Sequence, residues 1–275
     1  MKILAPLGIV VLLALCAWFG TSVLGLHVLF GIVVLYAAIV LFIVGFVIRV
    51  VCWGTFAVPF RIPTTCGQQE SLPWIKQAKT DNPSNYGGVI GRMLLEVLFF
   101  RSLFRNNKVE KRGSELAVGS AKWLWLGALA FHWSMLIIVL RHFRLFLDPV
   151  PAWVQVLEGA DSAFQIGIPI LYITDLLIVA ALTFLFLRRV VVPRIRYISL
   201  SVDYFPLFLL LGVALSGIAM RYIFRVDVTA VKELTMGLVT FAPVAGASIE
   251  PILYVHLFLV STRREIGRAS CRERV

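Results

Sequence analysis

Long runs of apolar residues, separated by short polar segments, occupy most of this chain. A helix needs about 20 predominantly apolar residues to cross the hydrocarbon core of a bilayer, and six runs approach that length. They are residues 3–19, 26–51, 123–140, 166–187, 204–220 and the run that begins at 244. This pattern predicts an all-α fold, a polytopic membrane helix bundle with about six transmembrane helices. For the first run a cleaved signal peptide is the alternative, although no small-x-small cleavage site follows it.

A seventh apolar stretch, residues 89–105, differs because it carries charges at near-helical spacing. These are Arg92, Glu96, Arg101 and Arg105. Such a pattern predicts an amphipathic helix that lies along the membrane surface. The surrounding segment, residues 52–120, contains four prolines and is not expected to fold as a separate domain.

Composition and charge narrow the class further. The chain has 60% hydrophobic residues, 15% charged residues and a mean hydropathy of +0.90, and this composition excludes a soluble globular protein. Eleven basic residues lie between Arg49 and Lys122 and four more between Arg188 and Arg196, which places these loops and both termini on the cytoplasmic side. The net charge of +11 is therefore mainly a topology signal, and no basic arm indicates nucleic acid as a partner.

Three of the four histidines lie in apolar runs. His132 and His142 are ten residues apart in the third run, and His256 lies in the last run. An imidazole inside a membrane is a poor packing group but a good axial ligand for haem iron. Ten residues of helix rise about 15 Å. Because this helix enters from the cytoplasm and reaches His132 first, His142 lies near the outer side. His256 enters from that same outer side.

We therefore expect His142 and His256 to be the two axial ligands of one haem b, and His132 to be a ligand of a second haem nearer the cytoplasm. No further histidine in this sequence matches the level of His132. Arg141 and Arg144 flank His142 and are candidate partners for the haem propionates. The alternatives are a hydrogen-bonded packing role for the histidines and ordinary snorkelling of the two arginines at a helix end.

Asp175 is a carboxylate inside an otherwise apolar run, where an unpaired charge is expensive. A quinol releases two protons with its two electrons, so a carboxylate near the outer haem is a candidate proton acceptor. Gln165 lies on the same half of the bundle and is the second candidate for a quinone site. The alternative is a protonated Asp175 that bonds a neighbouring helix.

Several strings are specific enough to indicate a family. They are residues 59–69 (Pro-Phe-Arg-Ile-Pro-Thr-Thr-Cys-Gly-Gln-Gln), 72–76, 91–105, 122–125 and 254–260 (Tyr-Val-His-Leu-Phe-Leu-Val). From Arg49 to Thr262 the chain resembles the M subunit of the membrane complex that serves dissimilatory sulfite reductase. Its histidine spacing is also similar to the gamma subunit of respiratory nitrate reductases. The resemblance implies a haem b subunit in the cytoplasmic membrane of a prokaryote.

In that family the subunit exchanges electrons with menaquinone or another quinone. It passes them to or from a cytoplasmic iron–sulfur subunit similar to heterodisulfide reductase, alongside other membrane-complex subunits, in dissimilatory sulfur metabolism. Residues 61–79 of the loop are the segment that we expect to contact the iron–sulfur subunit. A gamma subunit of nitrate reductase, a non-redox membrane anchor and a transporter are the other open interpretations.

The last eleven residues, 265–275, match one reading frame of a common sequencing adapter, and we expect them to be an artefact. The resemblance implies a further histidine about 18 residues after His256, where this sequence has Arg274. The second haem site is therefore incomplete here. The predicted division is 1–51 (two transmembrane helices), 52–120 (cytoplasmic loop with the interfacial helix), 121–264 (a truncated gamma-like cytochrome b domain) and 265–275.

Overall fold

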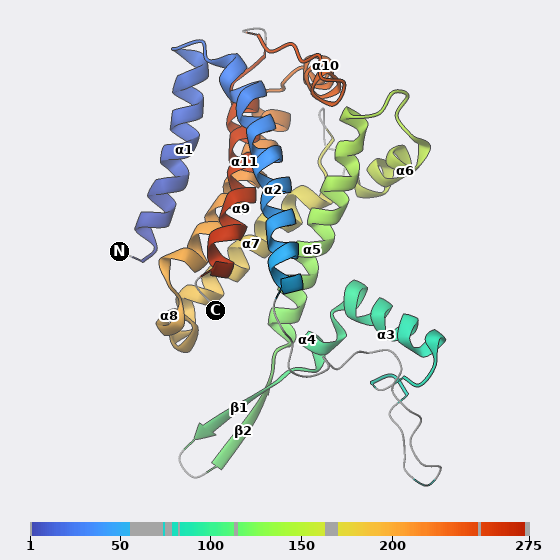
Figure 1. Cartoon of the computed structure of the whole chain (residues 1–275). Coiled ribbons are helices and arrows are strands. Elements are labelled where there is room, and N and C mark those ends of the chain that lie inside the picture. Colours follow the sequence, from blue (N-terminus) through green and yellow to red (C-terminus); the bar gives the residue numbers. More distant parts are fainter. Residues whose placement is uncertain are drawn as a thin grey trace. The chain divides into compact units, whose positions relative to one another are not determined.

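The computed structural model describes residues 2–55, 74, 79–81, 83–112, 115–162, 170–246 and 249–272, with the backbone alone for 107–118 and 263–272. Helices make up most of these residues, which confirms the predicted all-α membrane helix bundle (Figure 1). The chain forms two compact units. The first contains Met1–Cys52 and Ala130–Val275, and the second contains Trp53–Leu129.

Helices α2 and α5 each contribute residues to both units, and every other element belongs to one of them. The elements that lie wholly or largely in the first unit are α1 (Leu4–Ser22), η1 (Leu29–Val33), α2 (Val34–Thr55), α5 (Lys122–His142), η2 (Phe143–Leu145), α6 (Ala152–Asp161), α7 (Ile173–Val191), α8 (Pro193–Ile198), α9 (Ser201–Ile218), η3 (Ala219–Ile223), α10 (Val228–Val239) and α11 (Pro251–Arg272). The second unit holds α3 (Tyr86–Phe99), α4 (Arg101–Arg105), β1 (Asn107–Arg112) and β2 (Glu115–Ser120).

Four helical stretches of the described chain are long and apolar enough to cross a membrane. They are Leu4–Ser22, Leu29–Thr55, Lys122–Leu145 and Ser201–Ile223. The other two predicted spans also form helices, but they fall short of this criterion. Helix α7 begins at Ile173 and carries Asp175, Arg188 and Arg189, and the apolar part of α11 is limited to Pro251–Thr262.

The core of the first unit lies where α1, α9 and α11 pack together (Figure 1). Tyr204 of α9 and Tyr254 of α11 are its largest fully buried side chains. Gly31 makes room for Tyr254, because a Cβ at this position would lie 2.7 Å from the tyrosine ring. Helix α2 presents mostly exposed apolar side chains, a surface that suits lipid rather than water.

The elements that we did not predict are short. Helices α6, α8 and α10 connect the longer helices, and β1 pairs with β2 as an antiparallel hairpin in which Val109 lies opposite Val118. Strand β1 contains one apolar residue, so it lacks the alternating pattern that reveals a strand in a sequence.

Helix α3 forms where an amphipathic helix was expected. Asn85 caps its start by accepting a hydrogen bond from the Gly88 N–H at 2.7 Å. The exposed apolar side chains recur at helical spacing and form one face: Tyr86, Ile90, Met93, Leu94 and Val97. Its location on a membrane surface stays a prediction.

Asp81 holds the polar side of α3 and α4 together. Its carboxylate accepts hydrogen bonds from the guanidinium groups of Arg101 and Arg105, and its backbone carbonyl accepts one from Arg92. Glu96 closes the turn between the helices by accepting from the Ser102 N–H at 2.9 Å, and this bond lowers the pKa of Glu96. The hydrogen bonds from Arg101 and then Arg105 lower the pKa of Asp81 from 3.8 to about 2.

Because the folded-state pKa of Asp81 lies below its unfolded value, this contact stabilises α3 and α4 fully above pH 3.8. The stabilisation is lost as the pH falls through about 2. The variant Asp81→Asn should remove it at neutral pH, and hydrogen exchange in residues 86–105 should become faster. Asp148→Asn, which removes a carboxylate in the first unit, serves as the control. Unchanged exchange in Asp81→Asn would show that the carboxylate does not hold the two helices.

Candidate functional site

His142, the last residue of α5, has a defined ring orientation although its side chain is exposed. Its Nδ1 lies 2.6 Å from the carbonyl oxygen of Ile138, one turn earlier in the helix. A carbonyl only accepts hydrogen bonds, so Nδ1 carries the proton in this contact. The lone pair of the neutral imidazole is then on Nε2, the ring nitrogen that takes no part in the hydrogen bond to Ile138.

His256 on α11 shows the same protonation pattern. Its Nδ1 lies 2.9 Å from the hydroxyl oxygen of Ser216 on α9, and that hydroxyl lies 3.0 Å from the carbonyl oxygen of Val213. Since the serine hydroxyl has one hydrogen and donates it to the carbonyl, it accepts from the imidazole N–H. Gly217 makes room for the ring, because a Cβ there would lie 3.4 Å from Cε1 of His256.

His142 is the last residue of α5, and His256 lies in the second turn of α11. Two neutral imidazoles with bare Nε2 atoms and anchored Nδ1 atoms match the donor set that haem iron takes on its two axial sides. Within the described residues, no three or more histidine, cysteine, aspartate or glutamate side chains gather as a metal site.

The other two histidines lie elsewhere on the first unit's helices. His132 is exposed on α5 and its ring meets the edge of Phe131 at a centroid distance of 5.0 Å. The position that would match it, Arg274, lies outside the described residues. His27, to which the sequence analysis gave no role, lies 5.3 Å from the ring of Tyr254 and has a buried Nδ1 with no hydrogen-bond partner.

A cluster of charged and aromatic side chains surrounds Arg141, the neighbour of His142. The Arg141 guanidinium pairs with Asp161 of α6 at 3.0 Å and with Asp175 of α7 at 3.1 Å, and it stacks 3.7 Å over the ring of Tyr172. Arg141 itself is only 8% exposed. The cluster therefore joins the end of α5 to α6 and α7 through one buried cation.

The far side of this Arg141 cluster comes from η3. Tyr222 donates a hydrogen bond to Asp175 at 2.8 Å, and the guanidinium of Arg221 lies 4.1 Å from the ring centroid of Tyr172. Asp161 accepts two further hydrogen bonds, one from the Thr174 N–H at 3.0 Å and one from the Thr174 hydroxyl at 2.6 Å. Two arginines and two aspartates thus balance in charge.

The structure therefore gives most of the predicted site residues a partner. Asp175 is paired rather than isolated, and Arg144, 38% exposed at its side chain, pairs with Glu158 at 2.9 Å. Gln165 lies outside the described residues. Sequence reasoning missed Ser216, Arg221 and Tyr222. The available signal for the last two was an arginine–tyrosine pair at the end of an apolar run.

Comparison with known proteins places this sequence in a family. Residues 89–262 match the family described as the nitrate reductase gamma subunit. The chain is 44% identical over 241 residues to an "Hdr-like menaquinol oxidoreductase cytochrome b-like subunit" of Archaeoglobus fulgidus, which covers 85% of this chain and 72% of that protein. A protein of the same description from Archaeoglobus profundus is 38% identical over 232 residues, 82% of this chain and 67% of the relative.

No solved structure shows a significant match to this chain. The family match spans the helices that carry His132, His142 and His256, and both relatives align with more than four-fifths of the chain. With its apolar helices, the chain is a multi-pass membrane protein, and it belongs to the nitrate reductase gamma subunit family.

Proposed function

We propose that this chain is a haem b-carrying membrane subunit that exchanges electrons between a quinone and an iron–sulfur partner. The observation that carries the proposal is the pair formed by His142 and His256. Each ring is fixed through Nδ1 and keeps Nε2 available for iron. The cytochrome b-like and menaquinol oxidoreductase names of the two relatives support the same class of protein.

A haem held by His142 and His256 would supply one-electron transfer rather than oxygen chemistry. The residues of this chain set how it does so. The hydrogen bond from each Nδ1 fixes the plane of its ring and raises the basicity of Nε2. Ser216 is the partner whose hydroxyl a single substitution removes, whereas the Ile138 carbonyl belongs to the backbone.

The quinone site in this proposal lies at the Arg141 cluster, beside His142. Asp175 is its proton acceptor, as the sequence predicts, and its side chain is 16% exposed against 4% for Asp161. Oδ2 of Asp161 has two contacts, from Thr174 and Arg141, whereas each oxygen of Asp175 has one and keeps a lone pair. Gln165 remains the second candidate from the sequence.

Arg141 and Arg144 have different roles in this proposal. Arg144 pairs with a single carboxylate and is the more exposed of the two, so it is the better candidate for a haem propionate. Arg141 is held by two carboxylates and instead positions His142, because it joins the end of α5 to α6 and α7. Helix α5 is otherwise mostly exposed along its length.

The remaining parts of the proposal rest on the resemblance and on the names of the relatives. The subunit works in the cytoplasmic membrane with both termini in the cytoplasm, and it meets an iron–sulfur subunit similar to heterodisulfide reductase through residues 61–79. His132 serves a second haem, and the process is dissimilatory sulfur metabolism. A gamma subunit of nitrate reductase is the second candidate, favoured by the family match.

The visible spectrum of the purified protein tests the haem site. We expect a low-spin b-type spectrum that changes on reduction, and we expect His142→Ala and His256→Ala each to abolish the bis-histidine signal of this site. His27→Ala is the matched control, because it removes a histidine near α11 that has no ligand role in the proposal. An unchanged spectrum in His142→Ala would contradict the assignment.

Stopped-flow reduction by a menaquinol analogue tests Asp175. The variant Asp175→Asn should slow haem reduction by about 100-fold, the usual contribution of a positioned acid or base, because the quinol loses its proton acceptor. Haem content and reduction by dithionite should stay the same. Wild-type kinetics in this variant would remove Asp175 from the mechanism.

Thermal unfolding combined with the haem spectrum tests the anchoring role of Arg141. Arg141→Gln leaves Asp161 buried beside no cation and should cost roughly 3–5 kcal/mol of stability, with a broadened low-spin spectrum. Arg144→Gln removes a partly exposed pair and should cost below about 1 kcal/mol. Adding Asp161→Asn to Arg141→Gln should cause no further loss. Equal costs for the two arginines would refute the anchoring role.

A further inference from the structure

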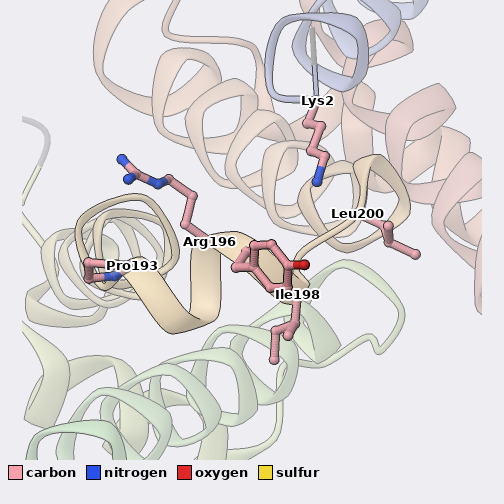
Figure 2. Close-up of a pocket in the computed structure, with 6 residues that line it drawn as sticks. Lys2, Pro193, Arg196, Ile198 and Leu200 are labelled. Carbon is pink, nitrogen blue, oxygen red and sulfur yellow. The ribbon is translucent and has the colours of Figure 1, made fainter.

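A shallow hollow lies where the start of α1 meets α8 and the start of α9 (Figure 2). Its lining comes from two segments that are about 190 residues apart in the sequence. The lining residues are Lys2, Pro193, Arg196, Tyr197, Ile198 and Leu200. None of them belongs to the histidine pair or to the Arg141 cluster.

The hollow lies at the depth of the lipid headgroups. Lys2 stands two residues before Leu4, where one candidate span begins, and Leu200 stands directly before Ser201, where another begins. Lys2 and Leu200 line the same hollow, so these two span ends lie at one level. Residues just outside the apolar part of a span lie at the membrane–water interface.

The hollow is cationic. Lys2 and Arg196 are both exposed, and within the described chain neither side chain pairs with a carboxylate or makes a hydrogen bond. Asp203, the acidic residue in the first turn of α9, accepts a hydrogen bond from the Leu200 N–H at 3.0 Å and caps that helix. An ammonium and a guanidinium without partners bind phosphate oxygens through charge-assisted hydrogen bonds.

Apolar surface lies beside the two cations. Tyr197, Ile198 and Leu200 are 85%, 72% and 56% exposed. A tyrosine in this position suits the interface, because its ring is apolar and its hydroxyl is polar. Free phosphate would leave the aliphatic side chains of Ile198 and Leu200 exposed, whereas the acyl chains of a phospholipid would cover them.

We propose that this hollow binds the headgroup of an anionic phospholipid. Lys2 and the Tyr197 hydroxyl bind the phosphodiester, and Ile198 and Leu200 contact the first part of the acyl chains. Arg196, whose guanidinium points away from Lys2 (Figure 2), adds positive charge at the edge of the hollow. The bound lipid fastens the start of α1 to the link between α7 and α9. This site is independent of haem and quinone binding.

Native mass spectrometry of the protein, released from micelles that contain equal amounts of phosphatidylglycerol and phosphatidylcholine, tests the proposal. The wild-type protein should retain phosphatidylglycerol in preference. Lys2→Gln combined with Arg196→Gln should lower this preference roughly 30-fold, from about fivefold for each basic residue at the surface. Lys2→Gln alone, which changes an exposed residue outside the helices, should lower it about fivefold and carries the test if the double variant fails to fold.

The matched control is Arg189→Gln combined with Lys232→Gln, which removes the same charge from residues that do not line the hollow. It should keep the preference for phosphatidylglycerol. An equal loss in this control, or no preference in the wild-type protein, would overturn the site. Displacement of the lipid by inorganic phosphate at the same concentration would overturn the assignment to phospholipid.

Discussion

The account depends on where two imidazoles carry their protons. The Ile138 carbonyl accepts a hydrogen bond from the Nδ1–H of His142, and the Ser216 hydroxyl, which donates to Val213, accepts one from the Nδ1–H of His256. Both rings are thereby neutral, with the lone pair that a metal would need on Nε2. If either ring were protonated at Nε2, the pair would be two unrelated histidines in a helix bundle.

The Arg141 cluster serves this pair by holding the helix end from which His142 projects. A buried arginine is costly unless its charge is compensated, and here two carboxylates and an aromatic face compensate it. Arg221 also contacts the ring of Tyr172, so one aromatic ring contacts both guanidinium groups. The same cluster contains Asp175, which pairs with Arg141 and is also the proposed proton acceptor for the quinol.

The sequence predicted the helices, because they follow from local rules, and the shared level of His142 and His256 stays a prediction. The thickness of a bilayer sets the length of an apolar run, and the rise of a helix sets the depth of His142. It did not predict the partners of Arg141, the Ser216 contact of His256 or the pairing of β1 with β2. These depend on segments far apart in the chain, and several candidates were available for each. The predicted role of the arginines at the propionates, the domain division and Gln165 stay predictions.

The most direct measurement of the central claim is electron–nuclear double resonance of the oxidised protein labelled with 15N-histidine. The account predicts a low-spin ferric haem coupled to two histidine nitrogens, one of which is lost in His256→Ala together with the low-spin signal. A wild-type spectrum without two coupled histidine nitrogens, or one that His256→Ala leaves unchanged, would contradict the account.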